Sequence, residues 1–113
     1  MAYDLVLAQR IREMLADTPL VSEKTMFGGI CFMVDEKMCV GVLKDELMCR
    51  IDPEDCDAAL EMNGCREMDF GGKSMKGYVL VDETGLRTSR ELKAWIGLCL
   101  KFNPQAKSSK RKK

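Results

Sequence analysis

Three short apolar runs separated by charged triplets constrain the fold more than any other feature of this sequence. The runs cover residues 30–34, 38–43 and 47–51. Apolar runs of five or six residues, joined by turns of three, predict β-hairpins. A crossover between parallel strands needs a dozen residues or more, so these strands are expected to be antiparallel neighbours.

Helix signals stand before and after these strands. Residues 4–16 place apolar side chains three or four positions apart, and Asp4 precedes the stripe as an N-cap. A second helix is expected from Asp52-Pro53 to about residue 62, because a proline in the first turn loses no hydrogen bond.

The rest of the chain predicts further strands and a last helix. Strands are expected at residues 22–27 and 75–81, with a glycine-rich loop at 70–74 in the least regular part of the sequence. Thr88 and Glu91 have the spacing of a capping box, in which each residue satisfies an amide of the first turn, and the helix they start continues to residue 102.

This order of elements predicts an α+β fold: an antiparallel sheet of about five strands with helices packed against it. The expected sequence is helix, about four strands, helix, one or two strands, helix. Residues 1–103 are expected to form a single domain, and 104–113 a disordered basic tail without an apolar anchor.

The location of the protein is inferred from what the sequence lacks. No apolar run approaches the ~20 residues that span a bilayer. The amino terminus has neither the cationic start nor the apolar stretch of a signal peptide. We therefore expect a cytoplasmic protein with no membrane contact.

The six cysteines are interpreted as reduced, structural thiols. They form no CxxC pair, the chain has no histidine, and most cysteines stand within apolar runs. A redox role and adventitious metal binding are the alternatives. The sequence therefore predicts no metal site and no cofactor.

Catalytic patterns are equally sparse. The Gly72-Lys73-Ser74 triplet resembles the end of a phosphate-binding loop, but that motif requires glycine where Glu67 stands and a helix after the serine. Without histidine there is no ordinary base for a serine or cysteine nucleophile. We predict that the protein is not an enzyme.

The net charge of zero conceals an uneven distribution. Residues 1–106 contain 13 basic and 18 acidic residues, a net charge of −5, and the remaining five basic residues lie in the tail. The tail residues are Lys107, Lys110, Arg111, Lys112 and Lys113. Such a cluster contacts nucleic-acid phosphates without sequence preference, or else serves only as a solubilising end.

Gly28-Gly29 is interpreted as a bend that leads one strand into the next, since neither a lysine nor a helix follows to build a phosphate site.

The bend is part of a wider pattern, which resembles the TfoX amino-terminal domain family over about residues 8–102. Its most specific parts are Met26-Phe27-Gly28-Gly29 and Leu47-Met48-Cys49-Arg50-Ile51-Asp52, supported by Met75-Lys76-Gly77-Tyr78 and Leu92-Lys93-Ala94-Trp95.

The resemblance implies an α+β domain with a secretion-chaperone-like architecture. It also implies a link to the bacterial regulator of DNA competence, which works with the cyclic-AMP receptor protein at promoters. Competence regulators of that kind carry a second, helical domain, whereas this sequence ends in the lysine-rich tail. We therefore expect a stand-alone regulatory domain.

Three functions follow as hypotheses. The first is a regulatory or adaptor domain that acts through protein contacts, with homodimerisation through a sheet edge or helix face left open. The second is a nucleic-acid-associated protein that uses its tail, and the third is a small-molecule sensor. Arg50 is expected to pair with Asp52; alternatively, with Lys24, it forms a partner or anion site beside Phe27 and the glycines.

Overall fold

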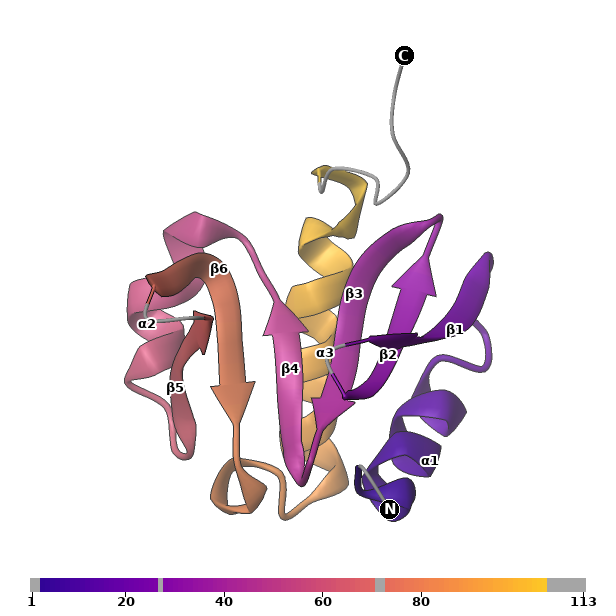
Figure 1. The fold of residues 1–113 in the computed structure, drawn as a ribbon, viewed down its shortest axis with the longest axis horizontal. Helices are drawn as coiled ribbons and strands as arrows, with labels where there is room; N and C mark the ends of the chain where they lie inside the picture. The colour runs from indigo at the N-terminus through magenta and orange to yellow at the C-terminus, as the bar shows by residue number, and fades with distance from the viewer. Residues whose placement is uncertain (1–2, 27, 71–72, 106–113) are drawn as a thin grey trace.

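The computed structural model describes residues 3–26, 28–70 and 73–105, and its centre is one antiparallel sheet (Figure 1). The strands are β1 (Val21–Met26), β2 (Gly29–Val34), β3 (Lys37–Leu43), β4 (Glu46–Arg50), β5 (Cys65–Phe70) and β6 (Lys73–Val81). Their order across the sheet is β1-β2-β3-β4-β6-β5. The predicted α+β class and the antiparallel pairing of the apolar runs are confirmed, with six strands in place of about five.

Three α-helices pack on one face of this sheet: α1 (Leu5–Met14), α2 (Cys56–Leu60) and α3 (Ser89–Phe102). Short 3-10 helices cover Pro53–Asp55, Glu83–Gly85 and Asn103–Gln105. The helix α3 lies over β3 and β4, whereas α2 lies over β5 and β6 (Figure 1). None of the helices in the described parts of the chain has the length and hydropathy to span a membrane.

The predicted caps of α1 and α3 are confirmed. Asp4 Oδ1 accepts hydrogen bonds from the amides of Val6 at 2.9 Å and Leu7 at 3.0 Å. In the capping box of α3, the Glu91 amide donates to Thr88 Oγ1 at 3.1 Å and the Thr88 amide donates to Glu91 Oε1 at 3.0 Å. Hydrogen bonds between the capping side chains and the amides of the first turn therefore set where both helices start.

The second helix is shorter than predicted. Asp52 caps it by accepting the Glu54 amide at 2.9 Å, but the first turn is a 3-10 helix and α2 ends at Leu60. The chain then turns at Gly64, whose φ is +76° and whose added Cβ would lie 2.5 Å from Asp82 Oδ1. Close packing of this turn against residue 82 ends the helix early.

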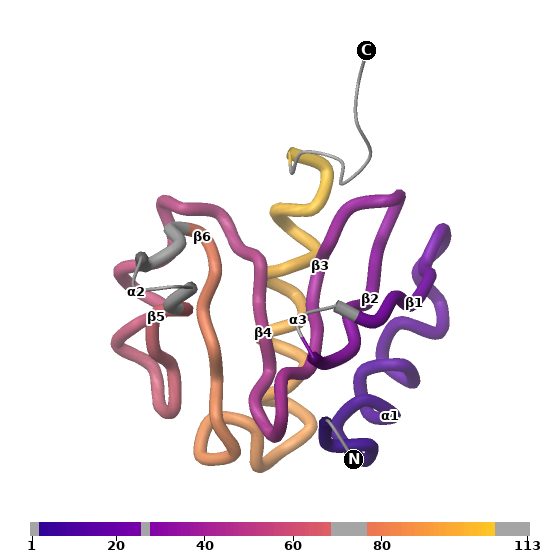
Figure 2. Tube along the Cα trace, in the orientation of Figure 1, coloured from indigo at the N-terminus to yellow at the C-terminus, as the bar shows by residue number. Residues whose placement is uncertain are grey.

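The least regular part of the sequence contains the second of the one or two strands expected after α2. The loop expected at residues 70–74 is wrong at its ends, because Phe70, Lys73 and Ser74 lie in strands. Residues 65–70 form the edge strand β5, and β6 covers Lys73–Val81. The trace of β5 runs beside that of β6 at one edge of the sheet (Figure 2). The sequence of β5 is largely charged, so it lacks the apolar pattern that marks a strand. The backbone hydrogen bonds with β6 stabilise this segment as a strand, although its local propensity does not predict one.

The two faces of the sheet carry different side chains. The helix-covered face is packed with branched aliphatic residues from the strands and with Trp95, Leu92 and Ile96 of α3. The opposite face holds a smaller cluster, called here the methionine face, which contains four methionines. Its members are Cys31, Met33, Met38, Met48, Met68 and Leu80, each at most 6% exposed.

Candidate functional site

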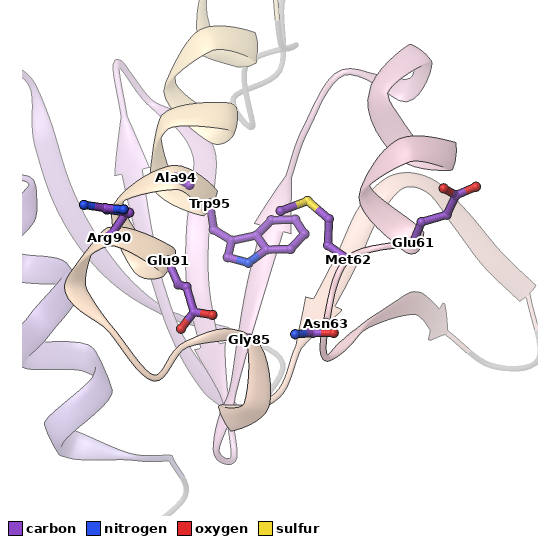
Figure 3. A pocket seen from close by; sticks show the side chains of 8 residues that line it. All are labelled: Glu61, Met62, Asn63, Gly85, Arg90, Glu91, Ala94 and Trp95. Atoms are coloured by element: carbon purple, nitrogen blue, oxygen red, sulfur yellow. The ribbon is translucent and has the colours of Figure 1, made fainter.

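A cavity of about 470 Å³ lies between the end of α2 and the start of α3 (Figure 3). The turn after α2 supplies one wall, the first two turns of α3 supply another, and Gly85 lies between them. The lining residues are Glu61, Met62, Asn63, Gly85, Arg90, Glu91, Ala94 and Trp95. We call this space the Trp95 cavity.

Trp95 gives the cavity its main polar donor. The side chain is only 2% exposed, yet its indole N–H donates no hydrogen bond to any residue that the structure describes. Figure 3 shows the nitrogen edge of the ring turned toward the side of the cavity where Glu91 and Gly85 lie. The N–H group is therefore directed at the cavity rather than at a partner within the fold.

Glu91 provides an acceptor on the same wall. One oxygen, Oε1, is engaged in the capping box with the Thr88 amide, while Oε2 accepts no hydrogen bond within the described part of the chain. Glu91 and Trp95 are four residues apart, so they share a helix face. In Figure 3 the Glu91 carboxylate points toward Gly85, whereas Arg90 and Glu61 extend away from the indole ring.

The cavity also has an apolar wall at Met62 and a floor formed by the backbone at Gly85. Met62 is 45% exposed and lies beside the indole ring (Figure 3). Gly85 is buried, and a Cβ there would lie 2.3 Å from the Asn63 carbonyl oxygen. This close approach requires glycine and holds the two loops together, so the shape of the cavity is built into the backbone.

Arg50 lines a second cavity, of about 250 Å³, together with Pro53, Gly77 and Tyr78. Its guanidinium carbon lies 5.6 Å from the centre of the Tyr78 ring, and Nη1 donates to the Met38 carbonyl at 3.4 Å. The predicted Arg50–Asp52 ion pair is not among the salt bridges of the described residues. Asp52 instead caps the following 3-10 helix.

The structure does not bring Lys24 and Arg50 together. Lys24 is exposed on the edge strand β1, and β2 and β3 separate it from β4, a distance on the order of 14 Å at normal strand spacing. Gly29 approaches Val42, while Arg50 reaches Met38 near the opposite end of β3. A single small anion therefore does not contact both residues, whereas the hypothesis of a partner site stays a prediction. Phe27 lies outside the described residues.

The cysteines are free thiols, and four of them have a raised pKa. All six are free; five are buried and Cys65 is partly exposed. Burial raises the pKa of Cys31 and of Cys65 to about 11. A hydrogen bond with Cys99 and burial raise the pKa of Cys39, and burial raises that of Cys99 well above its ordinary value. Thiols of this kind are poor nucleophiles at neutral pH, in agreement with a structural role.

The chain matches the model of a known protein family. The model of the TfoX N-terminal domain matches residues 13–103, about four-fifths of the chain. The chain belongs to the TfoX N-terminal domain family. Comparisons with curated proteins and with solved structures find no match.

In this TfoX N-terminal domain, the glycines of the MFGG motif occupy the turn between β1 and β2, where Met26 pairs with Gly29. Gly28 has φ +77°, a conformation that favours glycine. A Cβ on Gly29 would lie 2.0 Å from the Val42 carbonyl oxygen, so only glycine fits there. The basic tail at 107–113 lies beyond the family match and outside the described residues.

Sequence reasoning did not identify the Trp95 cavity. It placed Glu91 in a helix cap and Trp95 in the core, and both placements are confirmed. The available signal was the four-residue spacing of the two side chains, which puts a carboxylate beside an indole. Among the described residues, no group of three or more cysteines and carboxylates is arranged to hold a metal ion.

Proposed function

We propose that this TfoX N-terminal domain is a non-enzymatic regulatory domain that acts through protein contacts. Membership of the family supports a regulatory role related to competence. The observation that carries the proposal is a groove between α1 and α3 on the helical layer, with a volume of about 380 Å³. It is lined by Met14, Lys93, Ile96, Gly97 and Leu100.

Gly97 is the informative residue of this α1–α3 groove. It stands in the middle of α3 and is exposed, and no atom lies within 4 Å of the position that a Cβ would take. A glycine inside a helix costs about 1 kcal/mol relative to alanine. Since packing within the described chain does not require it, we infer that Gly97 permits the close approach of a partner's backbone.

The occupant we propose is an amphipathic helix of a partner protein. Such a helix places apolar residues against Met14, Ile96 and Leu100, and helices pack most closely where one of them has glycine. Lys93 is the charged residue of the lining, so the complementary position on the partner is an acidic side chain.

The test compares Gly97→Leu with Ala58→Leu, a control at an exposed position of α2. A protein captured from native lysate in the presence of nuclease is identified, purified and titrated against each variant. We expect Gly97→Leu to weaken binding at least about tenfold, as for a blocked interface centre, while the affinity of the control is unchanged. The thermal stability of Gly97→Leu is expected to rise slightly, because leucine is the better helix former.

Equal affinities for the two variants would exclude the groove as the docking surface. Capture that requires residues 107–113, and that is lost with nuclease or at high salt, would favour the alternative nucleic-acid function of the tail.

A further inference from the structure

The Trp95 cavity contains a donor and an acceptor that the described chain leaves without partners. The donor is the indole N–H of Trp95, in a side chain that is 98% buried because only 2% of it is exposed. The acceptor is Oε2 of Glu91, one helical turn earlier on the same face of α3. This N–H group opens onto the cavity, since no fully buried side-chain nitrogen or oxygen in the described part of the chain lacks a hydrogen-bond partner. Water or a ligand in the cavity therefore satisfies it, and a ligand that displaces the water has to offer an acceptor in its place.

The geometry points to the Trp95 cavity as a binding site for a primary carboxamide flanked by an apolar group. The amide carbonyl accepts a hydrogen bond from the Trp95 indole, and the amide N–H donates to the Glu91 carboxylate. Met62 and Ala94 offer the surface for the apolar flank. A primary carboxamide is the common group that presents an acceptor and a donor side by side, because its C=O and NH₂ share one carbon, whereas the C=O and N–H of a trans peptide bond point in opposite directions.

Other ligand classes fit these walls less well. An anion is repelled by the Glu91 carboxylate, which the capping box holds in place. A simple ammonium group satisfies Glu91 but offers no acceptor to the indole N–H. A purely apolar ligand leaves both polar groups desolvated and unpaired, which costs free energy.

The site is independent of the α1–α3 groove. The groove is lined by Lys93, Ile96 and Gly97, whereas the cavity uses Arg90, Glu91, Ala94 and Trp95. A negative result for ligand binding in the cavity therefore does not contradict the proposed helix-docking function. A negative result for helix docking likewise does not contradict the proposal for the cavity.

The test uses N-acetyl-L-leucinamide as the probe and NMR of the full chain as the readout. The chain has a single tryptophan, so its indole N–H gives one resonance that reports directly on the cavity. We expect a saturable downfield shift of that resonance, with a dissociation constant on the order of 1 mM for so small a ligand.

Two variants and one matched control sharpen the result. Glu91→Gln keeps the capping box but removes the charge, and we expect it to weaken binding about fivefold or more, because charged acceptors form the stronger hydrogen bonds. Met62→Ala removes the apolar contact at an exposed position and is expected to weaken binding several-fold. Glu61→Gln, whose side chain extends away from the indole, is expected to bind as the unmodified chain does.

The source of the carboxamide is distinguished by a second probe, an acetylated tripeptide that ends in leucinamide. Tighter binding of the tripeptide identifies a peptide segment as the natural ligand, and equal binding identifies a free small amide. The proposal is overturned if the indole resonance shows no saturable shift, or if N-acetyl-L-leucine methyl ester, which lacks the carboxamide N–H donor directed at Glu91, binds as tightly as the amide.

Discussion

The two faces of the sheet carry buried clusters that differ in the kind of side chain they contain. Leu47 and Met48 are neighbours on β4 and both are 0% exposed. Leu47 belongs to the helix-covered face, where strand and helix side chains are mostly branched and have few rotamers. Met48 belongs to the methionine face, where the unbranched thioethers of Met33, Met38 and Met68 surround it.

This difference shows that equal burial does not imply equal rigidity. A methionine has three rotatable side-chain bonds and adapts to irregular space, whereas branched side chains hold one shape. The helix-covered face fixes the positions of α1, α2 and α3, and with them the Trp95 cavity and the α1–α3 groove. No described helix packs on the methionine face, and we expect its flexible side chains to repack when a neighbouring residue changes.

The largest expected effect tests this contrast directly. We expect Leu47→Ala to lower the free energy of unfolding by about 3–5 kcal/mol, because rigid neighbours leave a cavity. Met48→Ala is expected to cost about 2 kcal/mol, since the surrounding methionines move into the space. Urea unfolding of both variants measures the difference, and equal losses would show that the two faces are equally rigid.

A second prediction concerns the β1–β2 turn. Gly29→Ala is expected to cost roughly 3 kcal/mol, because its Cβ would overlap the Val42 carbonyl and displace β2 or β3. Gly28→Ala meets no atom within 4 Å and is expected to cost about 1 kcal/mol, from its positive φ alone. Thermal melting in which Gly28→Ala is the more damaging change would contradict this explanation.

A third prediction uses the buried thiol of Cys31 on the methionine face. Its pKa is raised to about 11 by burial, so the folded state holds its proton more tightly than the unfolded state. The stabilisation is complete below the ordinary thiol pKa and is lost as the pH rises toward 11, by roughly 2 kcal/mol.

Guanidinium unfolding at pH 8 and pH 10.5 measures that loss. Cys31→Ala serves as the control, because the other titrating groups contribute to both proteins and cancel in the comparison. We expect the variant to lose less stability over this interval. Identical losses would mean that Cys31 does not contribute to the alkaline sensitivity.

The local features of the fold could be predicted because they depend on near neighbours in the chain. The Asp4 cap, the capping box of Thr88 and Glu91, and the hairpins of residues 30–51 each follow from short-range hydrogen bonding or from alternating apolar runs and turns. The strand β5 was allowed for but not located, because three of its six residues are charged and its strand conformation depends on pairing with β6.

The sequence by itself determined the antiparallel α+β class, the helix starts, the glycine turn and membership of the TfoX N-terminal domain family. The tertiary structure alone decided which side chains meet. It separates Lys24 from Arg50 by two strands, although the sequence offered them as one site. It also brings Met62 and Asn63 from the turn after α2 against Glu91 and Trp95 of α3. Local propensity acts over a few residues, whereas a cavity forms where distant elements pack against the same face of a sheet.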